Sequence, residues 1–353
     1  MQSGLDGVVA AETVLSDTDR ERGMIWVRGV ALPDMVASHG YEGTIALLWD
    51  GFAGKGLTRA GVRAELGTAR EAVFAGLGGW FDAAVRRPLF EGVRLCLANL
   101  PDDTPPAAII AALSVGVPAL LRAARGERPV PPDASLGTAA DVLRMLRGEA
   151  ADEPSVAALD TYFTVMAESG LSGSSFTARI VASTRASVVC AVLGAWCAFT
   201  GPLHGGAPGP TLDLLDAVAA APDIDAWVEQ RLVAGERLMG FGHRVFRGND
   251  PRAAAMRAAL RRMGSAAGRL GFAEEVERRV AAVLARVKPG RSLPANVEIA
   301  AALLLDAVGV PRAAFTPVFA VSRCAGWLAH AMEQRATGRM IRPTSRYVGA
   351  PSA

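Results

Sequence analysis

Apolar residues recur with a spacing near 3.6 along almost the whole chain after residue 30, and this periodicity restricts the fold most strongly. Such spacing puts apolar side chains on one face of a helix. The apolar content of 51% is dominated by Ala, Leu and Val, with only 6% aromatic residues, which also favours helices. We predict helices over residues 41–49, 59–78, 107–124, 139–146, 158–168, 176–200, 212–220, 225–238, 251–263, 273–287 and 317–335, and another opening at 295.

Residues 4–30 follow a different pattern. Short β-branched runs alternate there with turn residues, among them Ser16-Asp17 and Arg22-Gly23, which predicts a small hairpin. The predicted fold class is therefore all-α, mainly helical, with a small N-terminal β-hairpin. A length of 353 residues allows two domains or a single large one.

Charge and hydropathy argue against several classes of partner. Lys and Arg number 37 against 35 Asp and Glu, a net charge of +2 without a long basic run, so we expect no binding to nucleic acid or to a membrane surface. The apolar stretch 186–200 falls short of the roughly 20 residues of a membrane span, and we predict a wholly buried helix there. No basic and then apolar segment opens the chain, so we expect a cytoplasmic protein.

The four cysteines show no C-x-x-C spacing and lie in apolar sequence. We predict free, buried thiols and no metal site. The cysteines are Cys96, Cys190, Cys197 and Cys324.

Two of the four histidines lie in glycine-rich segments, His204 within residues 201–206 and His243 within 240–252. Glycine permits close backbone approach and positive φ, so these turns are suited to a ligand site. Asn296 is placed as a helix cap, with Glu298 in the first turn. From the residues alone, each histidine could equally be a structural hydrogen-bonding group, and Glu298 an acid favoured by the helix dipole. We interpret His39 and His330 as structural.

These segments resemble the citrate synthase family. The runs GPLHGG and GFGHRVFRGNDPR are followed by Asn296-Val297-Glu298, where the family has Asn-Val-Asp. Residues 4–8 with 27–29, and residues 322–343, also look like the family's two ends. The resemblance covers most of the chain and is weakest over residues 52–160.

The resemblance implies a two-domain helical fold. A large domain would comprise residues 1–204 and 312–353, with a small helical domain, 205–311, inserted between them. The site would lie in the cleft at the junction, which closure would shield from water. The family is dimeric, so a homodimer is expected.

The resemblance also implies a Claisen-type condensation of acetyl-CoA, or another acyl-CoA, with a 2-oxo acid to give a citrate-like hydroxy acid and CoA. Glu298 would remove the proton, His204 would donate to the enolate oxygen, and His243 would donate to the keto oxygen. No permanently bound cofactor or metal is implied; acetyl-CoA and CoA act as co-substrate and product.

Family motifs assign the ligand-binding groups as well. Arg252 and Arg323 would bind the oxo-acid carboxylates, and Arg342 would reach the neighbouring subunit's site, although on its own it reads equally as a surface arginine. Arg247 would lie near the phosphates of CoA. The backbone of one segment would surround the adenine: Leu238, Met239, Gly240, Phe241 and Gly242.

Two positions depart from the family pattern. Ser169 stands where the family carries a substrate-binding histidine, which predicts a wider and less cationic pocket. Glu298 is longer than aspartate by one methylene, on the order of an ångström, and misplacement by that much can cost about 100-fold in rate. We therefore predict an altered substrate preference. Three alternatives remain open: a non-catalytic relative that binds CoA or a metabolite, cleavage of a citryl-CoA-like thioester, and a helical assembly protein.

Overall fold

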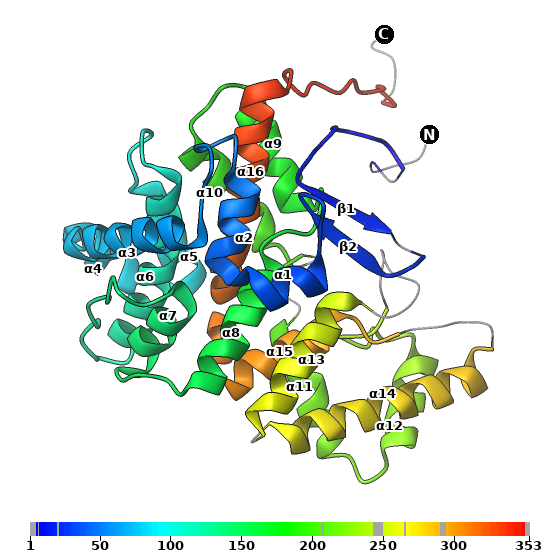
Figure 1. The fold of residues 1–353 in the computed structure, drawn as a ribbon. Helices are drawn as coiled ribbons and strands as arrows, with labels where there is room; N and C mark the ends of the chain where they lie inside the picture. Colours follow the sequence, from blue (N-terminus) through cyan, green and yellow to red (C-terminus); the bar gives the residue numbers. More distant parts are fainter. Residues whose placement is uncertain are drawn as a thin grey trace.

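The computed structural model describes residues 5, 7–19, 21–202, 204–205, 208–242, 250–264, 266–289 and 294–349. These residues form sixteen α-helices, one short 3₁₀ helix and a three-stranded sheet (Figure 1). The predicted all-α class with a small N-terminal β element is confirmed.

The sheet is antiparallel and consists of β1 (Ser16–Asp19), β2 (Met24–Val27) and β3 (Val30–Ala31). Ile25 and Val27 of β2 are buried, as expected for a strand with one face on the core. Arg22 and Gly23 lie in the turn between β1 and β2, as predicted. Ser16 and Asp17 were wrongly predicted as turn residues, because they pair with Val27 and Trp26 in the ladder.

The first half of the chain forms the larger group of helices. Their bounds are α1 (Leu32–Ser38), α2 (Gly40–Trp49), α3 (Arg59–Ala75), α4 (Gly79–Val85), α5 (Leu89–Ala98), α6 (Pro106–Ala124), α7 (Thr138–Arg147) and α8 (Glu153–Met166). Helices α1, α4 and α5 were not predicted. Helices α1 and α4 have seven residues each, and such short helices hold few apolar positions to reveal a period. Helix α6 is long and apolar enough to cross a membrane, but 78% of its apolar window is buried inside the fold.

The predicted helix over residues 176–200 is two helices, α9 (Gly173–Ser183) and α10 (Val188–Phe199). The chain turns at Arg185, whose φ is +71°, and Ser187 then caps α10 by accepting the backbone N–H of Cys190. A hydroxyl residue at an N-cap is a strong start signal, and here it overrides the continuous apolar pattern.

Helix α10 is not wholly buried, contrary to the prediction. Cys190 and Cys197 are exposed on one of its faces, whereas Cys96 and Cys324 are buried. The buried-thiol prediction is therefore wrong for two of the four cysteines. Seven residues make two turns of a helix, so Cys190 and Cys197 share the solvent side.

The second half comprises α11 (Pro208–Ala219), α12 (Ile224–Ala234), α13 (Pro251–Met263), α14 (Ala267–Val287), α15 (Val297–Ala307), the 3₁₀ turn η1 (Arg312–Ala314) and α16 (Phe315–Thr337). Helices α11–α14 gather on one side of the molecule in Figure 1, while α16 runs through the middle of the larger group. Helix α13 packs on α15 and on α8, and α15 also contacts α8. The proposed domain boundaries at 204 and 312 stay a prediction.

Helix α16 is buried along most of its length, including polar side chains such as Arg323 and His330. It contacts α2, α6, α8, α9 and α10. A helix surrounded by protein on all sides can present a charged group to an internal cavity from a rigid frame, and this is where the candidate site lies.

Candidate active site

A cavity of about 980 Å³ opens where β1, the start of α9, the end of α10, and helices α13, α15 and α16 approach one another. Five residues singled out from the sequence line it together: Ser169, His204, Arg252, Glu298 and Arg323. The cavity also carries hydroxyl groups and one further carboxylate from β1 and the loop before α9: Ser16, Asp17, Thr18 and Ser172.

His204 follows the end of α10 in a turn fixed by its neighbour Gly205. The Gly205 N–H donates to the Phe199 carbonyl at 2.9 Å, and the Thr316 hydroxyl donates to the Gly205 carbonyl at 2.9 Å. A Cβ on Gly205 would lie 2.7 Å from the Phe199 carbonyl oxygen. Glycine is therefore required here for close packing of the chain on itself, which sets the place of His204.

The hydrogen bonds of His204 determine its tautomer. The backbone N–H of Ser174 donates to Nε2 at 3.1 Å, and the Ser174 hydroxyl lies 2.8 Å from the same atom. The indole N–H of Trp327 donates to that hydroxyl at 3.1 Å. Since Nε2 accepts, the proton of the neutral ring is on Nδ1.

The His204 imidazole is held neutral. Burial lowers its pKa to about 4, and the positive charge of Arg323 acts in the same direction. The positive end of the α9 dipole beside Nε2 also disfavours the imidazolium. At neutral pH the ring is thus an uncharged N–H donor.

Glu298 lies in the first turn of α15, whose N-cap Asn296 accepts the Glu298 N–H at 2.9 Å. The predicted cap and the predicted place of Glu298 are confirmed. Its Oε2 atom is buried, and none of the described residues forms a hydrogen bond with it. Burial raises the pKa of Glu298 to about 7, although Arg252 and Arg323 oppose the increase. This carboxyl group can exchange a proton near neutral pH.

The segment that leads to His243 pairs with the segment that leads to Glu298. Gly242 N–H donates to the Pro294 carbonyl and Asn296 N–H to the Gly240 carbonyl, both at 2.8 Å, and the Asn296 side chain donates to the Gly242 carbonyl at 3.1 Å. Gly240 and Gly242 have φ of +84° and +82°, which glycine adopts without strain. Two motifs 54 residues apart therefore meet beside the cavity.

Arg252 is held in one orientation by Asp250. Asp250 caps α13, Pro251 is its first residue, and the Asp250 carboxylate accepts the N–H of Arg252, its Nε at 3.0 Å and its Nη2 at 2.6 Å. Nη1 donates to the Ser169 hydroxyl at 2.9 Å. A buried arginine with both edges engaged presents a fixed cation to the cavity.

Arg323 approaches the cavity from α16. Its Nε donates to the Met166 carbonyl at 2.7 Å, at the C-terminal end of α8, and its guanidinium carbon lies 4.9 Å from the centre of the Phe319 ring. Burial lowers the pKa of Arg323 to about 10, opposed by the carboxylate of Glu168. Arg323 is therefore still a cation at neutral pH.

The sequence matches a family model described as "Citrate synthase, C-terminal domain" over residues 4–344. The chain belongs to the citrate synthase family. It is 38% identical over 98% of its length, and over 92% of the relative, to a Mycobacterium tuberculosis protein named "Putative citrate synthase 2". It is 29% identical to a 2-methylcitrate synthase of the same species, covering 99% of this chain and 91% of that protein. A crystal structure of citrate synthase from Thermotoga maritima superposes with a TM-score of 0.88 at 25% identity, covering 100% of this chain and 97% of that one.

Three residues assigned by family resemblance are not among those found in this cavity. His243 and Arg247 lie outside the described residues, so their assignments stay predictions. Arg342 is exposed in the irregular tail that follows α16 and does not line the cavity. The adenine-binding role of residues 238–242 stays a prediction, and the pairing described above occupies several of their backbone groups.

Other site residues of this citrate synthase family member escaped the sequence analysis. Asp250 could have been found, because an aspartate before Pro-Arg is an N-cap signal. Ser174 and Trp327, which orient His204, carry no such signal. Neither does β1, because its side chains reach the cavity only through the packing of the hairpin on the helices.

Proposed function

We propose that this protein is a condensing acyltransferase that joins the acyl group of acetyl-CoA, or of another acyl-CoA, through its α-carbon to the carbonyl carbon of a 2-oxo acid. One observation carries the proposal. Glu298 with a pKa of about 7 and a neutral His204 line the same cavity as two buried arginines.

Glu298 serves as the base. Its carboxylate removes a proton from the carbon beside the thioester carbonyl, and the electron pair moves onto the thioester oxygen to form an enolate. A base whose pKa lies near the working pH suits this step, because it is partly ionised and yet basic enough to take the proton.

His204 stabilises the enolate. The Nδ1–H of the neutral ring donates a hydrogen bond to the oxygen that gains negative charge, while Nε2 stays bound to Ser174. A donor that is already oriented before the reaction needs no rearrangement as the charge develops.

The enolate carbon then attacks the keto carbon of the oxo acid. A carbon–carbon bond forms, and the keto oxygen takes up a proton; the family motif assigns the donor as His243. Water next cleaves the thioester, giving the free acid and CoA thiol. Arg252 and Arg323 bind the carboxylate groups of the oxo acid in this scheme.

Ser169 is the basis for an altered substrate preference. Its hydroxyl accepts a hydrogen bond from Arg252. Serine is neutral and small, whereas the family carries an imidazole at this position. This leaves more room and one fewer positive group for the acceptor. We therefore propose that the preferred oxo acid is not oxaloacetate, or that the preferred acyl group is not acetyl.

The test is release of free thiol from acetyl-CoA and longer acyl-CoAs, each paired with a series of 2-oxo acids. We expect turnover with at least one pair and a faster reaction with a pair other than acetyl-CoA and oxaloacetate. Fastest turnover with that ordinary pair would reject the altered preference. No turnover with any pair, combined with thermal stabilisation by CoA, would favour a binding protein over an enzyme.

The double variant Ser169→His with Glu298→Asp restores both family residue types. We expect its use of oxaloacetate relative to other oxo acids to rise above that of the starting protein. An unchanged ratio would show that these two positions do not set the preference.

A homodimer with Arg342 reaching the partner's site is part of the proposal. Mixing inactive Glu298→Gln chains with Arg342→Ala chains should then restore activity, since a hybrid dimer contains one site with both groups intact. Activity of the mixture no greater than the sum of the separate variants would contradict a shared site.

A further inference from the structure

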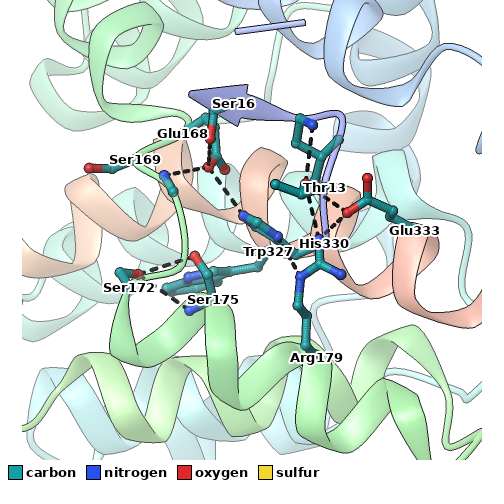
Figure 2. A network of polar contacts seen from close by, with 12 residues as sticks. Thr13, Ser16, Glu168, Ser169, Ser172, Ser175, Arg179, Trp327, His330 and Glu333 are labelled. Carbon is teal, nitrogen blue, oxygen red and sulfur yellow. Dashed lines mark hydrogen bonds and ion pairs between the residues drawn. The ribbon is translucent and has the colours of Figure 1, made fainter. Parts of the chain in front are cut away.

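A largely buried polar network adjoins the cavity at Ser16 and is not used in the chemistry proposed above. It links the segment before β1 to α16, α9 and the loop after α8 (Figure 2). Its members are Thr13, Ser16, Glu168, Arg179, His330 and Glu333.

Arg179 sets the proton positions of this network. Its side chain is 1% exposed, it forms an ion pair with Glu333, and its Nε donates to Nδ1 of His330 at 2.8 Å. A guanidinium cannot accept, so Nδ1 of His330 must accept and the ring proton is on Nε2. That N–H donates to Glu168 Oε1 at 3.1 Å.

Three donors converge on this single oxygen of Glu168. Besides His330, they are the Gly170 N–H at 2.6 Å and the Ser16 hydroxyl at 2.9 Å. Burial alone would raise the pKa of Glu168, but His330, Arg323 and the Ser16 hydroxyl lower it below the ordinary value. Glu168 is thus a fixed anion with strong, charge-assisted hydrogen bonds.

Two of these donors belong to different walls of the cavity, one in the loop before α9 and one in β1. Gly170, with φ of +65°, closes the turn that presents the Ser169 hydroxyl to Nη1 of Arg252. Ser16 opens β1, whose next residues, Asp17 and Thr18, line the cavity. One carboxylate oxygen therefore ties both walls together, and Glu168 directly precedes Ser169, whose hydroxyl contacts Arg252.

We propose that Glu168 is a positioning residue for the oxo-acid substrate: by holding the Gly170 amide and the Ser16 hydroxyl at one oxygen, it fixes the Ser169 turn and β1 at the spacing that the acceptor pocket requires. The effect on catalysis rests on the proposed function. The effect on the two walls does not.

Glu333 supplies a matched control within the same network. It is also a buried carboxylate and pairs with Arg179 of this network. Its other side-chain bonds are accepted from the Thr13 hydroxyl and the Val14 N–H, which do not line the cavity. If the network served stability alone, Glu168→Gln and Glu333→Gln would both lower the melting temperature and leave the substrate constants alone.

The first measurement is steady-state kinetics of the two variants in the full-length protein. We expect Glu168→Gln to raise KM for the oxo acid about tenfold, as for loss of a hydrogen bond to a charged group, with KM for the acyl-CoA changed less than about twofold. Glu333→Gln should lower the melting temperature and leave both KM values within about twofold. An unchanged oxo-acid KM in folded Glu168→Gln would overturn the proposal.

The second measurement is amide hydrogen exchange, which needs no activity. Glu168→Gln should speed exchange in residues 169–172 and 16–18 about tenfold, whereas Glu333→Gln should affect residues 13–15 only. Unchanged exchange in 169–172 in the Glu168 variant would also overturn the proposal. A wild-type protein without condensing activity would count against the proposed function, while the exchange result would still decide whether Glu168 fixes the walls.

Discussion

Two carboxylates near one cavity have pKa values that the fold shifts in opposite directions. Glu168, behind the wall, receives three hydrogen bonds at Oε1, and its pKa is lowered. Glu298, in the wall, has a buried Oε2 without a partner among the described residues, and its pKa rises to about 7. The donors around Oε1 of Glu168 account for the difference, because burial by itself raises the pKa of both groups.

The comparison separates a permanent anion from a proton acceptor. Environments that push the pKa values of two like groups apart are the usual means by which one site obtains both roles. Protonation of Glu168 at Oε1 would disrupt the three hydrogen bonds that converge there, whereas its Oε2 atom, like Oε2 of Glu298, has no partner among the described residues. In Glu298, burial outweighs the charges of Arg252 and Arg323, which favour the ionised form, so its pKa is raised.

The largest effect should come from Glu298→Gln. The amide keeps the shape but cannot take a proton, so we expect kcat to fall about 10³-fold, within the usual range for loss of a general base. The melting temperature at pH 7 should not fall, because an unpartnered buried carboxylate is removed. Thiol release measures the activity, and thermal unfolding measures the melting temperature. A variant that retains more than a tenth of the activity would show that Glu298 is not the base.

Next in size is Arg179→Met, which leaves Glu333 without its ion-pair partner in the buried network. Breaking a buried pair from one side costs about 3–5 kcal/mol of unfolding free energy, which urea denaturation would detect. Arg312→Met is the matched control, because its ion pairs with Asp213 and Asp216 lie on the surface and should contribute less than about 1 kcal/mol. Equal losses of unfolding free energy in the two variants would mean that the buried network contributes no more to stability than the surface ion pairs.

A pH effect should follow from Glu298. Because the base must be ionised in the free enzyme, kcat/KM should rise with pH and level off above an inflection near 7. His204, with a pKa of about 4, should add no inflection in this range. A profile that is flat between pH 5.5 and 8.5 would contradict the assignment of the base.

The same group should make the free energy of unfolding fall as the pH rises. The pKa of Glu298 is higher in the folded chain, about 7, than its ordinary value of 4.5, so between these values the folded state binds more protons than the unfolded state. Its contribution to the free energy of unfolding is therefore greatest below pH 4.5 and declines until pH 7. The melting temperature of wild type should fall relative to that of Glu298→Gln across this window.

The smallest effect should be that of Tyr162→Phe. The Tyr162 hydroxyl is buried, and nothing in the described part of the chain bonds to it. Replacing an unsatisfied polar group by an apolar one of similar shape is close to neutral, so we expect the free energy of unfolding to change by less than about 0.5 kcal/mol. A loss above about 2 kcal/mol would indicate that this hydroxyl has a partner, and Glu298 is the nearby group to examine.

Much of the local structure could be predicted from the sequence. The 3.6-residue period marks most of the long helices, and the cap at Asn296 correctly places Glu298 in the first turn of α15. Periodicity fails where a cap divides an apolar run, as Ser187 does between α9 and α10. It also cannot tell which side of a helix meets solvent, which is why the exposure of Cys190 and Cys197 was not foreseen.

What the sequence determined by itself is set by neighbours along the chain: helical period, caps and glycine turns depend on residues within about four positions of one another. The tertiary structure alone decided which groups meet. Ser16 reaches Glu168 across 152 positions, and Arg252 reaches Ser169 across 83. The distinct states of Glu168 and Glu298 arise from such distant donors and from burial, and neither can be read from the residues that flank them.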